Sequence, residues 1–347
     1  MKLKNKIFKA AVLFKQNKRL EIIDLKLPNK LEKGQVLVKV KSASICGAQI
    51  GEIKGVKGPD KWLPHCMGHE GYGEVVLKNK FVRNVNAGDN VIMHWRKGSG
   101  INAKPPSYDS KYGKVNAGQV TTFQEYSVVS ENRVTKVKKI EKKYHPIAPL
   151  LGCAIPTSWG ILNNEISINT NHRYLILGAG GVGTNLALIA KIYKIKNLIV
   201  ADKYNNKESF LKKLGINFIN VKKLKKEMFS FENVVDTTGN TKLISKGFDL
   251  LAKNGNLMLV GQPRKNELLK IQDPLRLFNP PCDHLKILTS DGGLFDPKTQ
   301  MKSIYNLMFK NIKKFQKIIS HNVTLNNINK GINYVEKGKA IRVSIKF

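Results

Sequence analysis

Hydrophobic and polar positions follow two different patterns along this chain of 347 residues. Before position 150, short alternating segments such as 35–40 and 73–77 are separated by glycine and proline turns, which is typical of a unit built from β-strands. From about residue 157 to residue 293, short apolar runs alternate with longer helical stretches. This second pattern predicts a doubly wound parallel sheet, so the chain is expected to be an α/β protein with a β-rich part.

The apolar runs also suggest where the domains begin and end. Four of them are strand candidates of the parallel sheet: 174–177, 198–201, 234–236 and 257–260. The last fifty or so residues return to a mixed pattern and end in residues 341–347, which read as a strand that completes the first domain. We therefore expect a catalytic domain in residues 1–155, completed by residues 295–347, and a nucleotide-binding domain in residues 156–294.

A glycine-rich turn follows the first strand of the predicted parallel sheet. The strand 174–177 leads directly into this turn, an apolar helix follows at 182–193, and an acid lies nineteen residues after the last glycine. Such a turn lets the backbone approach a pyrophosphate at a helix N-terminus, and the acid accepts hydrogen bonds from a ribose. The cofactor-binding candidates are Gly178, Gly180, Gly181, Val182, Gly183 and Asp202.

The acid also bears on the choice of cofactor. A carboxylate at Asp202 would repel the additional phosphate of NADP, so the sequence favours NAD. Lys207 lies five residues further along and could soften this preference by offsetting the negative charge.

The cysteine content and the apolar runs restrict the kind of protein. Four widely spaced cysteines include no CxxC pair, which argues against a disulfide framework and against a cysteine-rich structural zinc site. No uninterrupted apolar run approaches the roughly 20 residues that are needed to cross a bilayer. We therefore expect a cytoplasmic protein without a membrane partner.

The formal net charge of +35 would ordinarily suggest a nucleic-acid partner. Here the basic residues are nearly all lysine, they are spread over the whole chain, and asparagine and isoleucine are abundant as well. All three residues have AT-rich codons, whereas arginine, which makes bidentate phosphate and guanine contacts, is scarce. We therefore expect only weak, salt-sensitive attraction to polyanions and no specific nucleic-acid binding.

Three residues that could bind a metal lie far apart in the sequence: Cys46, His69 and Cys153. Two thiolates and one imidazole suit zinc and leave a fourth position for water or substrate. Composition alone does not group them. Other motifs accompany these three residues along the chain: the motif at 87–91, the glycine turn and the segment 338–342. Together they occur in the order typical of the zinc-dependent medium-chain dehydrogenase/reductase family, the alcohol dehydrogenase relatives. The chain resembles this family over nearly its whole length.

The resemblance implies a GroES-like catalytic domain beside a Rossmann domain that binds the nicotinamide cofactor. Cys46, His69 and Cys153 would hold zinc, and Glu70 would be a neighbour of the metal or a transient ligand. Further roles that the resemblance implies are a place near the nicotinamide for Thr157, a pyrophosphate contact for Arg342 and a place in the substrate pocket for Trp95. The expected partners are a small alcohol or carbonyl substrate and further copies of the chain in a homodimer or homotetramer.

The chain also departs from the family pattern. Relatives often carry four closely spaced cysteines that bind a structural zinc, whereas residues 97–119 contain none, so one zinc per chain is expected. Alcohol dehydrogenases commonly have a serine or threonine where this chain has Ala48, and they can have a relay histidine where it has Gly51. Water, the cofactor ribose or Glu70 could replace the usual proton route.

The implied activity is reversible oxidation of an alcohol to a carbonyl with NAD(H). Arg96 and Lys97 suggest a polar or anionic substrate such as a sugar derivative, although a solvated basic loop explains them equally well. Cys66 is assigned to packing, and the role of His65 is left open. The alternatives are a zinc-free reductase of the same superfamily and a non-catalytic module that binds NAD.

Overall fold

The computed structural model describes residues 6–225 and 230–347 of the chain. It divides into two units, which are treated separately below. The first comprises Met1–Pro156 together with Phe295–Phe347, and the second comprises Thr157–Leu294. The C-terminal segment therefore belongs to the same unit as the N-terminal half of the chain.

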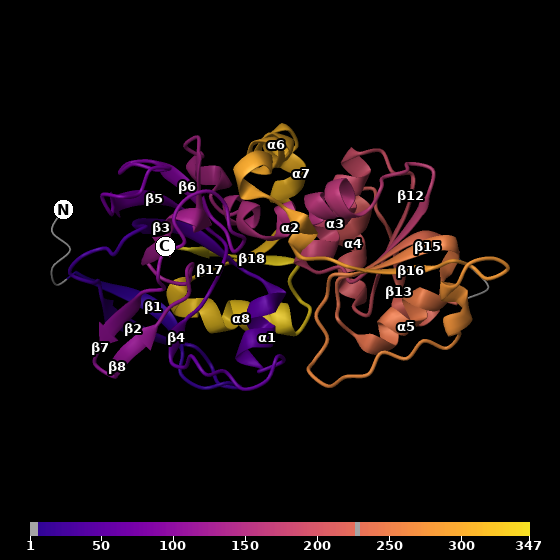
Figure 1. The fold of residues 1–347 in the computed structure, drawn as a ribbon, viewed down its shortest axis with the longest axis horizontal. Helices are drawn as coiled ribbons and strands as arrows, with labels where there is room; N and C mark the ends of the chain where they lie inside the picture. Colours follow the sequence, from indigo (N-terminus) through magenta and orange to yellow (C-terminus); the bar gives the residue numbers. More distant parts are fainter. Residues whose placement is uncertain (1–5, 226–229) are drawn as a thin grey trace. The chain divides into compact units, whose positions relative to one another are not determined.

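A small closed barrel and a larger sheet make up most of the first unit (Figure 1). The barrel contains β1 (Ile7–Leu13), β2 (Glu21–Lys26), β7 (Ser107–Ser110), β8 (Gly113–Asn116) and β4 (His65–Cys66). The sheet follows the order β10 (Val134–Val137), β6 (Asn90–Met93), β5 (Gly71–Lys78), β3 (Gln35–Ile45), β18 (Arg342–Lys346) and β17 (Ile319–Thr324), and β9 (Tyr126–Ser130) also pairs with β3. Inward-facing apolar residues of these strands form the core.

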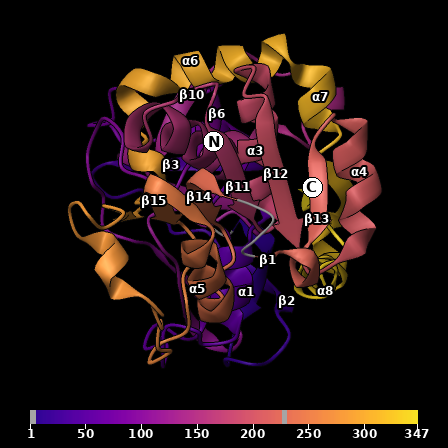
Figure 2. The same ribbon diagram turned by 90° about the vertical axis from the view of Figure 1, so that its right-hand side faces the viewer.

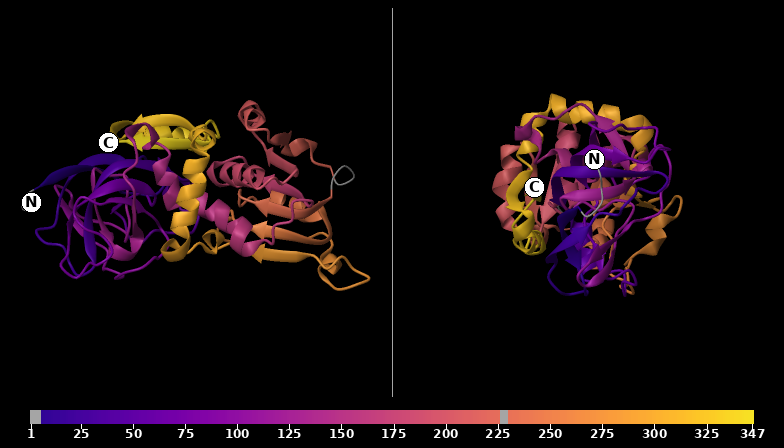
Figure 3. Two further views of the ribbon diagram at one scale, coloured as in Figure 1. Left: turned by 90° about the horizontal axis from the view of Figure 1, so that it is seen from above. Right: turned by 90° about the vertical axis from the view of Figure 1, so that its left-hand side faces the viewer.

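The C-terminal strand lies beside a strand from the first fifty residues (Figure 3). β18 pairs antiparallel with β3, and Val343 lies opposite Ile45. Helix α8 (Ile328–Glu336) packs Ile328 and Ile332 into the same apolar cluster as these two residues. The other helices of this unit are α1 (Gly47–Ile53), α6 (Pro297–Lys310) and α7 (Ile312–Gln316). Packing between the two ends of the chain therefore holds the end of β3, where the first candidate metal ligand follows.

A buried carboxylate holds the loop that precedes the β7–β8 hairpin. Glu131 is 1% exposed. Its Oε1 accepts the backbone N–H groups of Arg83 at 2.6 Å and Asn84 at 2.9 Å, and its Oε2 accepts the N–H group of Ile101 at 2.9 Å. Hydrogen bonds to an ionised acceptor are among the stronger ones. One side chain thus fixes two segments of loop.

A six-stranded parallel sheet forms the second unit. Figure 2 shows its strands side by side, in the order β13 (Asn217–Asn220), β12 (Asn197–Asp202), β11 (Arg173–Leu177), β14 (Phe231–Asp236), β15 (Leu251–Leu259) and β16 (Lys286–Thr289). The helices are α2 (Ala154–Gly160), which begins at the end of the first unit, α3 (Gly181–Ile192), α4 (Glu208–Lys213) and α5 (Thr241–Asp249). In chain order the strands run 3-2-1-4-5-6, which is the doubly wound order of dinucleotide-binding domains.

The predicted fold class is confirmed: one unit is β-rich and the other is a doubly wound parallel sheet. The four predicted strands of the parallel sheet correspond to β11, β12, β14 and β15. Strands β13 and β16 were not predicted. Each has four residues, most of them half-exposed, so the sequence shows only a short apolar run at each strand. Within the described residues, no helix is both long enough and apolar enough to span a membrane.

Candidate functional site

Three residues from distant parts of the first unit converge at one point. The Sγ atoms of Cys46 and Cys153 and a ring nitrogen of His69 all lie within 4.8 Å of one another. Cys46 is the N-cap of α1, directly after β3; His69 lies between β4 and β5; and Cys153 follows a short helical turn at Ala148–Gly152. We call these three residues the thiolate cluster. The structure therefore brings together the three residues that the sequence proposed as zinc ligands.

Close packing fixes the backbone before His69. Gly68 has φ of +91°, a conformation that side-chain-bearing residues rarely adopt. A Cβ atom there would also lie 2.6 Å from the Phe123 ring. The turn that presents His69 to the two cysteines therefore requires a glycine.

The pKa values of the two cysteines are shifted in opposite directions. A hydrogen bond from the Cys153 thiol holds the pKa of Cys46 well below its usual range, and the charge of Arg342 acts in the same direction against burial. The same hydrogen bond, together with burial, raises the pKa of Cys153. Burial lowers the pKa of His69, but the effect of the neighbouring Cys46 is larger and raises it. These shifts favour the thiolate form of Cys46.

Gln49 connects two members of the thiolate cluster. Its Oε1 accepts the backbone N–H group of Cys46 at 2.9 Å, and its Nε2 contacts Nδ1 of His69. Gln49 is 1% exposed. One amide thus positions both the first cysteine and the imidazole.

A buried ion pair lies beside the thiolate cluster. Nη2 of Arg342 donates to Oε1 of Glu70 at 2.5 Å, and both side chains are almost completely buried. Burial raises the pKa of Glu70 to about 7, although the guanidinium of Arg342 opposes that rise. Arg342 also stabilises the Cys46 thiolate through its charge. The two residues therefore set the charge around the candidate metal centre.

The donor atoms of the thiolate cluster fit zinc. Two sulfurs and one imidazole nitrogen are the ligand set of open catalytic zinc sites. Nε2 of His69 and Oε2 of Glu70 are buried without a hydrogen-bond partner among the described residues. An unsatisfied buried nitrogen beside two cysteines is explained if a cation is its partner.

The predicted nucleotide turn occurs in the second unit, between β11 and α3. Gly178 has φ of +102°, and Gly180 is the N-cap of α3 without a side-chain cap. At Gly183, a Cβ atom would collide with the carbonyl oxygen of Gly178, so only glycine permits this close packing. The first turn of α3 thus presents backbone N–H groups and the positive end of its dipole, as anion binding requires.

Asp202 faces the glycine turn from the end of β12. Its Oδ2 accepts the backbone N–H group of Ala179 at 2.7 Å, and its Oδ1 accepts that of Tyr204 at 2.9 Å. The ammonium of Lys207 lies 3.4 Å from Oδ2, and both side chains are at most 10% exposed. The carboxylate is therefore fixed at the turn, and a partly buried lysine offsets its charge.

The remaining predicted site residues fall in both units. Trp95 lies in the first unit, where its carbonyl oxygen accepts a hydrogen bond from Arg133 and the guanidinium of Arg96 is centred 5.5 Å from its ring. Thr157 lies in α2 and is 6% exposed. Arg342 contacts Glu70 within the first unit, and its expected contact with a pyrophosphate stays a prediction.

Sequence reasoning missed Gln49 and the partnership of Glu70 with Arg342. A signal existed for Gln49, because a glutamine three residues after an N-cap is the spacing of a capping box, and the structure has that arrangement at Cys46. For the ion pair no local signal existed, because 272 residues separate its members.

Comparison with known proteins supports the same family from sequence. The model of the alcohol dehydrogenase GroES-like domain matches residues 32–139, and the model of the zinc-binding dehydrogenase domain matches residues 181–312. Alcohol dehydrogenase 1 of Pisum sativum is 26% identical, over 97% of this chain and 96% of the relative. Alcohol dehydrogenase class-3 of Cereibacter sphaeroides is 23% identical, over 98% of this chain and 99% of the relative.

Solved structures show the same fold. Benzyl alcohol dehydrogenase from Acinetobacter calcoaceticus superposes with a TM-score of 0.85 at 23% identity, covering 99% of each chain. An alcohol dehydrogenase zinc-binding domain protein from Burkholderia ambifaria gives a TM-score of 0.87 at 20% identity, covering 99% of this chain and 100% of that one. The two family models together match more than half of the sequence, and the relatives match it from end to end. The chain therefore belongs to the zinc-type medium-chain dehydrogenase/reductase family.

Proposed function

We propose that this protein is a zinc-dependent oxidoreductase that interconverts an alcohol and a carbonyl with NAD(H). The observation that carries the proposal is the convergence of Cys46, His69 and Cys153 in a buried cluster whose imidazole nitrogen has no other partner among the described residues. Family membership supports the reaction class, because the relatives that match this chain are alcohol dehydrogenases.

The thiolate cluster would hold zinc through its two sulfurs and one nitrogen. When bound, zinc polarises the substrate oxygen and the nicotinamide accepts or donates the hydride. The residues of the chain prepare the site for this chemistry. Gln49 orients the imidazole, and Arg342 stabilises the thiolate charge of Cys46. Cys46 and Cys153 are buried and His69 is half-buried, so the protein encloses the two sulfur atoms.

Glu70 is proposed to accept and release the proton of the reaction. This chain lacks a hydroxyl at Ala48, so the usual route outward is missing. The pKa of Glu70 is raised to about 7 by burial, and its Oε2 has no hydrogen-bond partner among the described residues. A carboxyl group with such a pKa exchanges a proton readily near neutral pH.

The glycine turn of the second unit is the proposed cofactor site. Its glycines and Val182 would receive the pyrophosphate at the N-terminus of α3, and Asp202 would accept hydrogen bonds from the ribose. The same carboxylate favours NAD over NADP. Lys207 lies against it and limits that preference, because it offsets the charge that would repel an additional phosphate. Thr157 is proposed to lie near the nicotinamide, as in the family.

The proposed substrate is polar or anionic. The guanidinium of Arg96 lies beside the Trp95 ring and brings a positive charge to the residue that the family places in the substrate pocket. Arg96→Ala is expected to raise KM for such a substrate, and an unchanged KM would contradict this part of the proposal.

The test combines zinc analysis with turnover. Cys46→Ala is expected to lose the tightly held zinc and NAD-dependent oxidation of alcohols, because one of three ligands is gone. Cys66→Ala is the matched control: it also removes a buried thiol, but one outside the thiolate cluster. Retention of zinc and activity in Cys46→Ala would overturn the proposal.

Ala48 favours a second candidate, a module that binds NAD without catalysis. Such a module would bind NAD with an affinity that Asp202 controls, yet turn over no alcohol or carbonyl even when fully loaded with zinc. Activity of any kind that Cys46→Ala abolishes would exclude it. Assembly into a homodimer or homotetramer is a separate proposal, tested by light scattering of the purified protein.

A further inference from the structure

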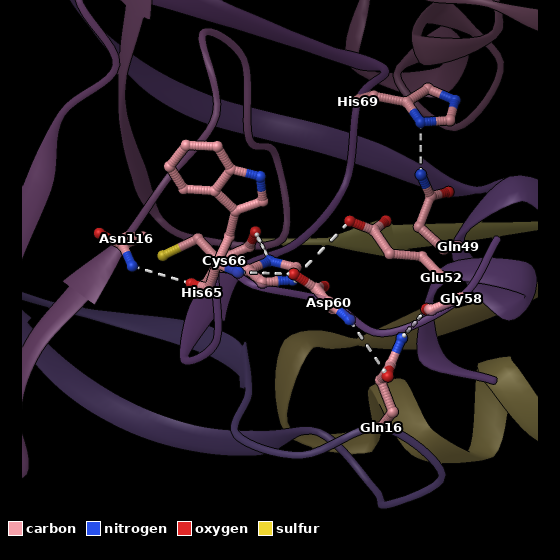
Figure 4. Close-up of polar contacts among 10 residues, drawn as sticks. Gln16, Gln49, Glu52, Gly58, Asp60, His65, Cys66, His69 and Asn116 are labelled. Carbon is pink, nitrogen blue, oxygen red and sulfur yellow. Dashed lines mark hydrogen bonds and ion pairs between the residues drawn. The ribbon is translucent and has the colours of Figure 1, made fainter. Parts of the chain in front are cut away.

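A second group of metal-ligand side chains lies outside the thiolate cluster, also in the first unit (Figure 4). Glu52 is in the last turn of α1, Asp60 in the following loop and His65 at the start of β4. Their ligand atoms all lie within 4.8 Å of one another. We propose that these residues, here called the carboxylate cluster, form a second site for a divalent transition-metal ion, for which Zn²⁺ and Co²⁺ are the probes.

The orientation of the His65 ring carries the first step of the argument. Nδ1 lies 2.9 Å from the carbonyl oxygen of Cys66, which can only accept a hydrogen bond, so Nδ1 carries a hydrogen. Nε2 is then the nitrogen that faces the carboxylates, 2.8 Å from Asp60 Oδ2 and 3.9 Å from Glu52 Oε1. Metal-ligating histidines usually donate their other N–H group to a carbonyl or carboxylate in this way. The ring is 7% exposed, so its orientation is fixed.

The carboxylate of Asp60 is fixed as firmly as the ring. Its Oδ1 accepts the N–H group of Trp62 at 2.8 Å, which leaves Oδ2 directed at His65. The side chain of Asp60 is 13% exposed. Gln16 holds the same loop from both sides, because its Nε2 donates to the carbonyl oxygen of Gly58 and its Oε1 accepts the N–H group of Asp60. Two of the three ligands are therefore in place before a metal binds.

Glu52 supplies the third ligand and the access route. Its side chain is 43% exposed, so an ion and its water can reach the cluster. Burial raises the pKa of Glu52, and the neighbouring charge of Asp60 adds to that rise against the effect of His65. Two carboxylates that face one imidazole repel each other. A divalent cation between them would offset this repulsion.

The ligand chemistry and the spacing suit zinc. Imidazole nitrogen and carboxylate oxygen are both zinc ligands, and three protein ligands leave a fourth position for water. Tetrahedral bonds of about 2.0–2.1 Å place neighbouring ligand atoms about 3.4 Å apart. The observed 2.8 Å and 3.9 Å lie on either side of that spacing, so small side-chain movements would complete the site.

Metal binding here would stiffen the segments that hold the thiolate cluster. Glu52 is on the same short helix that Cys46 caps, and His65 precedes His69 by four residues. A metal between Glu52 and His65 would tie α1 to the chain that leads to His69. In Figure 4, Gln49 lies between Glu52 of the carboxylate cluster and His69 of the thiolate cluster. The second site therefore fits a supporting role for the first.

Titration of the metal-free protein with Co²⁺ tests this proposal independently of activity. Cobalt bound to thiolates absorbs intensely through sulfur-to-metal charge transfer, whereas cobalt bound to nitrogen and oxygen shows only weaker visible bands. We expect two equivalents per chain, one with and one without charge-transfer bands. Glu52→Gln and Asp60→Asn are each expected to raise the Kd of the second equivalent at least tenfold, while the charge-transfer bands of the first equivalent remain. Glu141→Gln, which alters an exposed acid elsewhere in the unit, is the matched control.

Two results would overturn the proposal. The first is a single equivalent of cobalt in the wild-type protein, with charge-transfer bands only. The second is a second equivalent whose Kd is the same in the wild type, Glu52→Gln and His65→Gln, which would assign that ion to an adventitious surface position. Circular dichroism of each variant checks its fold, and Glu52→Gln changes a half-exposed side chain without changing its shape, so it keeps the test usable if the buried variants do not fold.

Discussion

The thiolate cluster and the carboxylate cluster share neighbouring segments of the first unit but differ in chemistry and in surroundings. The first offers two buried sulfurs and a nitrogen from the half-buried His69. The second offers two oxygens and a nitrogen, with Glu52 half open to solvent. Soft thiolates bind zinc tightly, whereas carboxylates bind a wider range of divalent ions less selectively. Two adjacent groups of ligands in one unit can therefore differ in their affinity for zinc and in their selectivity among divalent ions.

The two clusters also balance their charge by different means. Beside the thiolate cluster, Arg342 and Glu70 form a buried ion pair whose members depend on each other. Solvent surrounds part of the carboxylate cluster instead, so its charges are screened. Losing one charge should therefore be far more costly beside the first cluster than at the second. The four predictions below test this contrast, from the largest expected effect to the smallest.

Cys153→Ser should abolish function at the first cluster alone. In the proposed function this thiolate is a zinc ligand, so its loss should remove several kcal/mol of transition-state stabilisation and lower kcat/KM by roughly a thousandfold or more. The weaker cobalt bands of the carboxylate cluster should remain. Steady-state kinetics and cobalt spectra check both outcomes, with Cys66→Ser as the control. Loss of both sets of bands in a folded variant would show that the two clusters are not separate.

Glu70→Gln should destabilise the protein much more than Glu52→Gln. Removing Glu70 leaves the guanidinium of Arg342 buried without its partner, which costs about 3–5 kcal/mol. The half-exposed Glu52 lacks such a partner of fixed geometry, so its variant should lose less than about 1 kcal/mol. Urea unfolding of both variants in metal-free buffer measures the difference. Equal losses would contradict the contrast in charge balance.

His94 provides a buried histidine that belongs to neither cluster. Its Nδ1 contacts the carbonyl oxygen of Arg96 and its Nε2 the hydroxyl group of Thr135, and burial lowers its pKa to about 4. The unfolded chain binds this proton at about pH 6.5, so the free energy of unfolding should fall as the pH drops from 6.5 toward 4, by on the order of 3 kcal/mol.

The measurement is urea unfolding of the wild type and His94→Gln across this pH range. The variant should be less stable at neutral pH but should lose less of its remaining stability on acidification. Parallel pH profiles for the two proteins would mean that another group, such as a member of one of the clusters, carries the acid sensitivity.

Asp202→Ser should have the smallest effect and should leave both clusters unchanged. The carboxylate at the glycine turn would no longer repel the phosphate of NADP, while Lys207 would become free to attract it. We expect the preference for NAD, measured as the ratio of kcat/KM values, to fall by roughly tenfold. Glu208→Ser, which alters an acid six residues further along, is the control. Unchanged selectivity would remove the role that we propose for Asp202.

How far each site could be predicted depends on how its residues are distributed along the chain. The nucleotide turn is contiguous, so Gly178, Gly183 and Asp202 could be identified from a strand, a turn and a helix in order. The thiolate cluster spans residues 46–153, and only resemblance to a family grouped it. Contacts that depend on tertiary packing, such as Arg342 with Glu70, could not be predicted.

The carboxylate cluster illustrates an intermediate case. Glu52, Asp60 and His65 lie within fourteen residues, but their spacing matches no motif, and an acid in a loop is ordinarily solvated. The conformation of the loop after α1 decides whether these side chains meet. That conformation depends on contacts such as Gln16 with Gly58, across 42 residues. Sequence patterns that describe helices and strands do not capture such contacts.

The carboxylate of Glu131 should make this part of the fold insensitive to oxidation and chelation, unlike a four-cysteine lobe that binds zinc. It accepts hydrogen bonds from the backbone N–H groups of residues 83, 84 and 101 and so holds these loops. Peroxides and chelators attack zinc held by sulfur, but they have no target in a carboxylate that accepts amide hydrogens. Oxidation or metal removal should therefore abolish activity at the proposed catalytic centre and leave these loops folded. Adding reductant and metal should then restore the activity without refolding.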